Sequence, residues 1–282
     1  MIKVFNSYNL NRDDVINLWM SSFGDTREYI EFFLDNCPDY LCVEYLIEDK
    51  PVSMLFLLNG RLSNGKSKYL YAACTDSEFR RRGLMEALID FVKIHCKDNG
   101  YSGIFLVPAN EKLYSYYSKF GFLPSFNKKS LCVKSMDVYS ERFNTSDINR
   151  ILEAKKKLLL KIDGFSFDDD VMKYTIEEHI FNGGFVFLKQ IEAETILIFY
   201  YFDGKDIVIK ELLTDFSDIS CIFKEHFGNK SSENIYICAP LVYNSRDIVE
   251  KYTKCGMYFP LDEKTSDFLL DHTALYAGMY LD

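Results

Sequence analysis

An apolar strand pattern runs directly into an arginine-rich loop, and the loop opens a helical pattern. Lys68–Thr75 (KYLYAACT) has the composition of a buried strand, Phe79–Met85 (FRRRGLM) forms the loop, and Gly83–Lys97 carries apolar residues at helical spacing. The first turn of a helix presents backbone N–H groups that lack partners, and the helix dipole adds positive potential there. Gly83 lets a ligand approach the backbone closely, and the arginines supply charge. The segment therefore predicts either a phosphate-binding loop or an ordinary solvated turn.

The surrounding sequence predicts a mixed α/β fold. Two strands, Tyr40–Ile47 and Val52–Leu58, flank a polar turn and are typical of a β-hairpin. The remaining predicted elements are a helix at Asn11–Phe23 with Asn11 as its N-cap, a strand at Ser102–Val107, and a short helix at Glu111–Phe120 that Gly121 closes.

Two motifs, in this order, decide how the arginine loop is interpreted. Arg80, Gly83 and Met85 stand at the marked positions of a pyrophosphate loop of the form Gln/Arg-x-x-Gly-x-Gly/Ala, although Met85 departs from the usual small residue. About 30 residues downstream, a second motif has an Asn, a Tyr-Tyr pair and a Gly-Phe pair at fixed spacing. Its members here are Asn110, Tyr116, Tyr117, Gly121 and Phe122.

With both motifs in place, Tyr40–Phe122 resembles the Gcn5-related N-acetyltransferase (GNAT) family. The resemblance implies a mixed, mostly antiparallel sheet flanked by helices, which splays between its fourth and fifth strands and holds acetyl-coenzyme A in the gap. It implies that the backbone of Ala73, Cys74 and Thr75 polarises the thioester. The residues expected to cradle the pyrophosphate are Arg80, Arg81, Arg82, Gly83, Leu84 and Met85. Asn110 is expected to bond the pantetheine arm or the helix that follows, and Tyr114 to line the cofactor wall or the core.

The same resemblance makes Tyr117 the candidate general acid. A phenol, with an ordinary pKa of about 10, can protonate a departing thiolate whose ordinary pKa is about 8.5. Glu44 is the first candidate for the base that accepts the proton of the amine, through a bound water, and Asp25 and Glu28 are alternatives. Cys74 has no histidine near it in sequence, so we expect a small buried residue there and not a nucleophile.

The second half predicts a repeat of the first. Lys251–Met257 (KYTKCGM) aligns with YYSKFGF, which pairs Tyr252 with Tyr117, and strands are predicted at Gly184–Leu188, Thr195–Phe202, Asp206–Leu213 and Ile235–Pro240. The segment equivalent to the arginine loop, Thr214–Ile219, lacks Gly and Arg and carries Asp215 and Asp218, which would repel pyrophosphate. We therefore expect a tandem protein: a catalytic domain at residues 1–142 and a degenerate GNAT-like domain at residues 143–282, with the boundary near Ser140–Ser146.

Charge and composition limit the classes of partner that the protein is expected to bind. Residues 1–142 carry as many Lys and Arg as Asp and Glu, so the whole excess of −9 lies in residues 143–282. This balance argues against nucleic acid and is compatible with a cationic substrate. The four scattered histidines and the cysteines without a CxxC pair predict no metal site and reduced thiols. No apolar run approaches the length of a membrane span and no signal core begins the chain, so we expect a cytoplasmic protein.

Two functions of different classes remain. The first is an N-acetyltransferase that moves the acetyl group of acetyl-coenzyme A directly to a primary amine, carried by an unknown small molecule or peptide. The second is an acyl-coenzyme A-binding sensor without turnover. A dinucleotide-binding domain is excluded because the sequence has no GxGxxG after an early strand. The oligomeric state, monomer or homodimer, stays open.

Overall fold

The computed structural model describes residues 1–63, 65–134, 147–217, 219, 234–244, 249–272, 275–279 and 281, and the chain forms two compact units. The first unit contains Met1–Pro124 and Gly256–His272, and the second contains Ser125–Cys255 and Thr273–Asp282. The predicted division at residue 142 gave each unit one continuous stretch, whereas each unit here takes a segment from the other half of the chain. The predicted boundary at Ser140–Ser146 lies outside the described residues.

The first unit contains the elements predicted around the arginine loop. Its strands are β1 (Ile2–Phe5), β2 (Leu41–Ile47), β3 (Lys50–Leu62), β4 (Gly65–Thr75), β5 (Gly103–Leu106) and the end of β12 (Val249–Pro260). Its helices are α1 (Arg12–Phe23), α2 (Arg27–Asn36), the 3-10 turn η1 (Ser77–Phe79), α3 (Leu84–Asp98), α4 (Glu111–Ser118) and α8 (Glu263–Asp271). The predicted hairpin, strands and helices are confirmed within a few residues at each end, since their signals are local.

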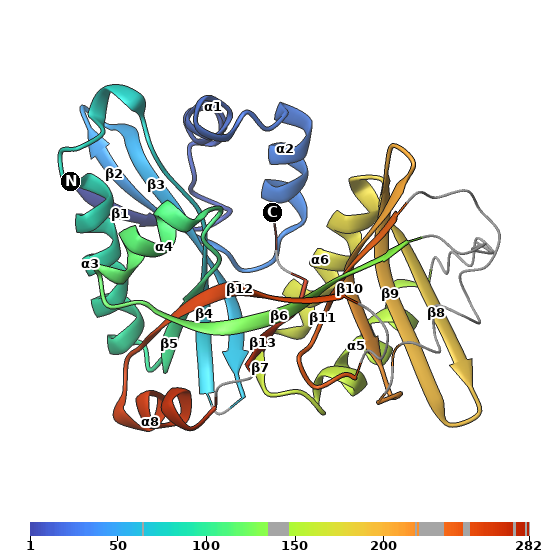
Figure 1. Ribbon diagram of the computed structural model, residues 1–282. Coiled ribbons are helices and arrows are strands. Elements are labelled where there is room, and N and C mark those ends of the chain that lie inside the picture. The colour runs from blue at the N-terminus through green and yellow to red at the C-terminus, as the bar shows by residue number, and fades with distance from the viewer. Residues whose placement is uncertain are drawn as a thin grey trace. The chain divides into compact units, whose positions relative to one another are not determined.

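Antiparallel pairing dominates this sheet, as predicted. β1, β2, β3 and β4 pair antiparallel in that order, β4 and β5 pair parallel, and β5 pairs antiparallel with β12. In Figure 1, α1 and α2 lie on one face of this sheet, and α3 and α4 lie on the other. The unit is therefore a sheet between two layers of helices.

The two faces of the first sheet have different cores. On the side of α1 and α2, Trp19 and Phe33 pack against Phe56 of β3 and Tyr71 of β4, with ring centroids 5.0–5.6 Å apart. On the side of α3 and α4, aliphatic residues of β2 to β5 pack against α3 and against tyrosines of α4. Because both faces are buried, the strands hold a fixed register, and the residues at the end of β4 are held in place.

The strand next to β5 comes from the end of the chain. Met257–Pro260 of β12 pair with Gly103–Leu106, and this segment belongs to the first unit. The strand that follows α4 in sequence, β6 (Leu123–Lys134), instead pairs with β11 (Asn234–Ala239), and from Ser125 onward it belongs to the second unit. The two units have therefore exchanged equivalent strands. No local sequence signal specifies such a pairing, because the partners are far apart in the chain.

The second unit is built in a similar order. Besides β6 and β11, its strands are β7 (Gly164–Phe167), β8 (Phe185–Ile191), β9 (Glu194–Asp203), β10 (Asp206–Thr214) and β13 (Tyr276–Ala277), and its described helices are α5 (Ile148–Leu159) and α6 (Asp169–Phe181). β8, β9 and β10 pair antiparallel, β10 pairs parallel with β11, and β7 pairs parallel with β13. A meander followed by a parallel strand is also the order of β2 to β5 in the first unit.

The sequence motif that predicted the repeat nevertheless occupies different secondary structure in its two copies. YYSKFGF lies at the end of α4, whereas Lys251–Met257 lies in strand β12, so Tyr252 is not the counterpart of Tyr117. The two glycines also differ in function. Gly121 has φ of +83° and closes a helix, while a Cβ on Gly256 would lie 2.4 Å from the ring of Phe105. The β-forming Tyr and Thr favour a strand at this position.

Candidate functional site

β4 leaves β5 after only three residue pairs. Ser67, Lys68 and Tyr69 pair with Gly103, Ile104 and Phe105, and β4 then continues alone on that side to Thr75. The edge of β4 beyond Tyr69 has no strand partner on the β5 side within the described chain, so its backbone groups there are open to a ligand. This is the splay between the fourth and fifth strands that the resemblance implies.

A β-bulge lies on this open part of β4. Tyr71 and Cys74 pair with Phe56 and Met54, so two residues, Ala72 and Ala73, face the single residue between them on β3. Ala72 has φ of +46°, a strained conformation for a residue other than glycine. Bulges redirect backbone groups, and here the redirection occurs where the sheet opens. The sequence did not indicate the bulge.

Buried hydroxyls hold the end of β4. The Ser53 hydroxyl, which is fully buried, donates to the Cys74 carbonyl at 3.0 Å and lies 2.8 Å from the Thr75 hydroxyl. Burial raises the pKa of the Cys74 thiol to about 12, so the thiolate is scarce at neutral pH. Cys74 is thus a buried structural residue, as expected, and Ser53 is a supporting residue that sequence reasoning missed because a lone serine in a strand carries no signal.

The three arginines differ in their contacts. Arg80 donates from Nε to the Thr75 carbonyl at 3.0 Å, and Arg82 donates from Nη2 to the Glu78 carbonyl at 2.9 Å. Arg82 also lies over the ring of Phe79, 4.9 Å from its centroid. Arg81 sits at φ of +62°, so it marks the sharpest turn of the loop. Arg80 and Arg82 therefore brace the backbone of the loop, and all three side chains are exposed.

The first turn of α3 is open. Gly83 is its N-cap at φ of +75° and provides no side-chain cap. The backbone N–H groups of Gly83, Leu84 and Met85 have no hydrogen-bond partner among the described residues. Leu84 is buried and Met85 packs against the core, so the departure of Met85 from a small residue leaves the N–H groups accessible. Such a turn favours an anion.

The second motif forms helix α4 and its cap. Asn110 caps this helix, because its side chain accepts a hydrogen bond from the Leu113 N–H at 3.2 Å. Tyr114 and Tyr117 are each only 8% exposed and belong to the core beside α3. Burial raises the pKa of Tyr117 above its ordinary value, and the Cys74 thiol is among the groups that raise it further. The phenol of Tyr117 therefore stays protonated at neutral pH.

Glu44 is a buried carboxyl on the face of the sheet opposite to α3 and α4. It pairs with Met54, which pairs with Cys74, so the three side chains share one face across β2, β3 and β4. Glu44 is 2% exposed, and the Cys42 thiol lies 3.6 Å from its Oε1. Burial raises the pKa of Glu44 to about 7, and the charge of Asp14 adds to this shift. A carboxyl of this kind exchanges protons at neutral pH.

The two alternative carboxylates have other surroundings. Asp25 accepts a hydrogen bond from the indole of Trp19 at 2.7 Å, which ties it to α1. Glu28 is exposed in the first turn of α2. A pair of tyrosines that the sequence did not single out lies between α2 and β4, where the hydroxyls of Tyr29 and Tyr71 are 2.9 Å apart. These phenols lie on the same face as Glu44.

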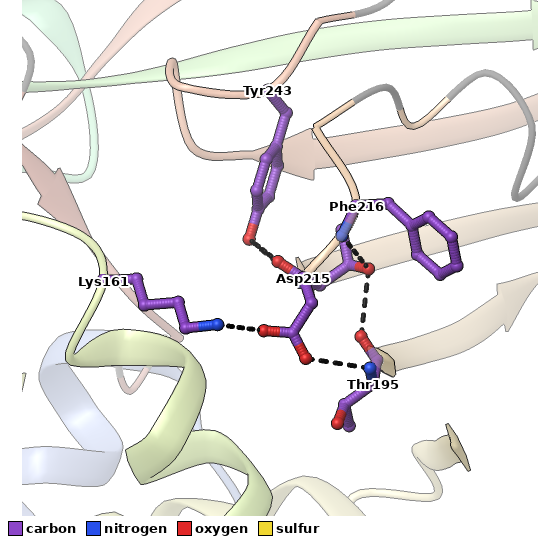
Figure 2. A network of polar contacts seen from close by, with 6 residues as sticks. Lys161, Thr195, Asp215, Phe216 and Tyr243 are labelled. Carbon is purple, nitrogen blue, oxygen red and sulfur yellow. Dashed lines mark hydrogen bonds and ion pairs between the residues drawn. The ribbon is translucent and has the colours of Figure 1, made fainter. Parts of the chain in front are cut away.

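The loop after β10, at the place equivalent to the arginine loop, is filled by its own contacts (Figure 2). Asp215 pairs with Lys161 through one carboxylate oxygen and accepts the Thr195 N–H through the other at 2.9 Å. The Asp215 N–H donates to the Thr195 carbonyl, the Phe216 N–H donates to the Thr214 hydroxyl, and the Thr214 N–H donates to the Tyr243 hydroxyl. Three consecutive N–H groups are thus used internally. Asp218 lies outside the described residues.

Within the described parts of the chain, no group of three or more His, Cys, Asp and Glu side chains is placed to hold a metal ion. No helix of the described residues is long and apolar enough to cross a membrane.

Residues 8–122 match the model of the acetyltransferase (GNAT) family, whose members transfer acyl groups from acyl-coenzyme A. No curated protein matches the chain.

Several solved structures have the same fold over nearly the whole chain. A GCN5-related N-acetyltransferase from Kribbella flavida has a TM-score of 0.66 at 15% identity, covering 93% of this chain and 72% of its own. Eis1 from Mycobacterium abscessus has a TM-score of 0.69 at 7% identity, with 94% and 75% covered. A putative acetyltransferase from Pyrococcus horikoshii has a TM-score of 0.54 at 14% identity, with 100% and 94% covered. Residues 8–122 therefore match the acetyltransferase (GNAT) family model, and the chain shares the fold of these solved structures.

Proposed function

We propose that the first unit transfers an acetyl group from acetyl-coenzyme A directly to a primary amine. The observation that carries this proposal is the continuous open edge from the bulge of β4 to the first turn of α3. Within the family, that edge offers unpaired backbone groups to a pantetheine arm and unpaired N–H groups to a pyrophosphate. Tyr117 and Glu44 then lie near the end of β4 where the thioester would be placed.

The cofactor roles follow from the contacts. Backbone groups of Ala73, Cys74 and Thr75 pair with the pantetheine arm, and an N–H at the bulge polarises the thioester carbonyl. The N–H groups of Gly83, Leu84 and Met85 bind the pyrophosphate, while Arg81 adds charge and Arg80 and Arg82 keep the loop in shape. Asn110 caps helix α4. Tyr114 lines the wall of the cofactor site and packs in the core.

Tyr117 acts as the general acid. Its raised pKa keeps the phenol protonated at neutral pH, so the proton is present when the carbon–sulfur bond breaks. The phenol gives its proton to the departing thiolate, which leaves as the free thiol of coenzyme A.

Glu44 acts as the general base through water. A pKa of about 7 is well matched to accepting the proton of an amine near neutral pH. Glu44 lies two strands from β4, which places its backbone about 10 Å from that of Cys74. The proton must therefore pass along at least one water molecule. Holding the amine beside the thioester supplies most of the remaining rate acceleration.

The second unit is a degenerate copy that does not bind the cofactor. The filled loop after β10 supports this assignment, because Thr214, Asp215 and Phe216 leave no N–H for a phosphate and Asp215 brings a negative charge. One protein molecule is accordingly expected to bind one molecule of acetyl-coenzyme A.

Calorimetric titration of acetyl-coenzyme A tests directly whether the arginine loop and the first turn of α3 bind the cofactor. We compare the full chain with Arg81→Glu and with Lys97→Glu, which makes the same charge change at the exposed far end of α3. Binding at one site per chain, weakened about tenfold or more only by Arg81→Glu, is the expected result. Two sites per chain would overturn the degenerate second unit, and no binding would overturn the cofactor site.

Release of free thiol separates an enzyme from a sensor. The full chain at saturating acetyl-coenzyme A is supplied with a panel of amines, and thiol is measured over time, with propionyl-coenzyme A as the test of acyl preference. Amine-dependent thiol release is the expected result. Tight binding without release for any amine would instead support a non-catalytic acyl-coenzyme A sensor.

A further inference from the structure

One carboxylate between α1 and α2 has no role in the proposed mechanism. Asp25 follows Gly24, which ends α1 at φ of +79°, so it lies on the turn that leads into α2 (Figure 1). Its Oδ2 accepts a hydrogen bond from the Trp19 indole at 2.7 Å, and Trp19 is 1% exposed. A buried ring therefore fixes the orientation of a carboxylate that is itself only half-buried.

No cation neutralises Asp25 within the described residues. Arg27, two positions further along, pairs instead with Asp13 at 3.2 Å and with Glu31 at 2.9 Å. The neutral indole of Trp19 is the one described donor to Asp25, whereas a carboxylate has about four acceptor positions. Asp25 thus offers a negative charge in a fixed orientation, with which a cationic ligand can pair.

An aromatic cluster connects Asp25 to the end of β4. The Trp19 ring that holds Asp25 lies 5.6 Å from the Tyr71 ring, and the Tyr71 hydroxyl lies 2.9 Å from that of Tyr29 on α2. Tyr71 stands two residues before Ala73, at the bulge where the thioester is proposed to lie. The carboxylate and the proposed thioester position are therefore at two ends of one set of contacting side chains.

This aromatic cluster reaches the surface at Phe23. The Phe23 ring is 49% exposed and lies 6.3 Å from the Trp19 ring, and Tyr29 is also only half-buried. Exposed aromatic faces attract cations, because the face of a ring carries negative potential, and they pack well against alkyl chains. Together with the charge of Asp25, they favour an ammonium group carried on an apolar chain.

We propose that the acceptor is a diamine and that Asp25 binds its second ammonium group. The alkyl chain lies along Phe23 and Tyr29, and the first amine reaches the thioester beside Ala73. This inference rests on the acyl transfer proposed above and names the class of acceptor that the same site takes.

Only the first amine reacts in this arrangement. Its nitrogen bonds to the acetyl carbon as the carbon–sulfur bond breaks, its proton passes through water to Glu44, and Tyr117 gives its proton to the sulfur. The second amine stays protonated on Asp25, away from the thioester. The products are therefore a monoacetylated diamine and the free thiol of coenzyme A.

Thiol release with 1,5-diaminopentane and with 1-aminopentane tests the proposal, since these amines differ by one charge. The full chain should use the diamine with a kcat/KM about tenfold or more above that of the monoamine, and mass spectrometry should find one acetyl group per diamine. The carboxylate of 5-aminopentanoate replaces the second ammonium, so this compound should be the poorest of the three. That comparison needs no variant.

Asp25→Asn removes the charge and keeps a side-chain oxygen that can accept the indole N–H. It should lower kcat/KM about tenfold for 1,5-diaminopentane, mainly through KM, and leave the value for 1-aminopentane within about twofold. The affinity for acetyl-coenzyme A and the melting temperature should be unchanged. Glu28→Gln, which removes an exposed carboxylate three residues further along, is the matched control and should alter none of these quantities.

Different outcomes reject different steps. No thiol release with any amine of the panel would overturn the proposed function and this inference together. Release with other amines but not with the diamine would overturn the inference alone. So would equal kcat/KM values for the three compounds, or equal losses for the diamine and the monoamine in Asp25→Asn.

Discussion

The hydroxyls of Ser67 and Tyr258 lie 2.6 Å apart, although 191 residues separate them in the chain. Ser67 begins the part of β4 that pairs with β5, and Tyr258 lies on the segment of β12 that pairs with β5 from the other side. Their contact joins three strands just below the point at which β4 and β5 separate. Strand β12, near the end of the sequence, is therefore part of the sheet that carries the candidate site.

This contact predicts that Gly103 tolerates no side chain while Tyr258 is present. A Cβ on Gly103 would lie 2.1 Å from the Tyr258 ring, so Gly103→Ala should lower the free energy of unfolding by about 1–3 kcal/mol. Urea unfolding measures this loss of unfolding free energy. In a Tyr258→Ala background the same change should cost much less, because the clash is gone. Equal costs in both backgrounds would show that β12 does not pack there.

Tyr117→Phe should reduce kcat by about 10²-fold or more and leave the affinity for acetyl-coenzyme A within about twofold. The change removes only the hydroxyl that is proposed to protonate the thiolate, and acid catalysis is typically worth about 10²–10⁴ in rate. Tyr114→Phe is the matched control, since Tyr114 lies on the same helix with the same exposure of 8%. Steady-state kinetics and calorimetry measure both quantities, and similar losses of kcat in the two variants would reject the assignment.

Local signals account for what the sequence predicted. The hairpin of β2 and β3, the strand that ends at Thr75, helix α3 and the Asn110 cap all depend on periodicity or on a single residue type at a helix end. Each was located within a few residues. The strand–loop–helix arrangement around the arginines was also predictable, because a strand, a glycine and a helical pattern follow one another directly.

Long-range pairing and burial account for what it did not predict. Nothing in Met257–Pro260 specifies β5 as its partner. The sequence therefore did not predict the exchanged strands or the discontinuous units. The similarity of KYTKCGM to YYSKFGF misled because three matching residues do not fix whether a glycine ends a helix or admits a ring. Glu44 was predicted on its position, but its raised pKa arises from packing around it, which only coordinates reveal.

The activity should rise with pH through about 7 because only the ionised form of Glu44 accepts a proton. Glu44→Gln should remove this limb of the kcat/KM profile and lower its plateau about tenfold or more. Glu28→Gln, at an exposed carboxylate, should leave the profile unchanged. A Glu44→Gln variant that keeps the limb would assign it to another group.

Glu44 should also affect stability, in a predictable direction. Its folded pKa is raised, so its contribution is present below the unfolded value of about 4.5 and is lost as pH rises towards 7. His179, whose folded pKa is lowered to about 4, acts in the opposite direction, because the unfolded state takes up its proton as pH falls below about 6.5. The free energy of unfolding of the protein minus that of Glu44→Gln isolates the first effect. It should fall between pH 4.5 and 7, and a constant difference would contradict the burial of this carboxyl.

Asp215→Asn should destabilise the second unit without altering the first. Its carboxylate is 8% exposed and holds both Lys161 and the Thr195 N–H, so its loss should lower the free energy of unfolding by about 1–2 kcal/mol. Asp169→Asn breaks an ion pair with Lys156 in which the carboxylate is 62% exposed, and it should be nearly neutral.

The loss of unfolding free energy on Asp215→Asn should depend on pH, and this dependence provides a second check on the contacts of Asp215. Desolvation alone would raise the pKa of Asp215, but the hydrogen bonds from Lys161 and Thr195 outweigh it and lower the pKa. The stabilisation is therefore present above the unfolded value of about 3.8 and is lost as pH falls through the folded pKa. Acetyl-coenzyme A should still bind at one site per chain in Asp215→Asn. A second site appearing on loss of this carboxylate would mean that Asp215 alone, and not the internally bonded N–H groups of the loop, keeps the second unit empty.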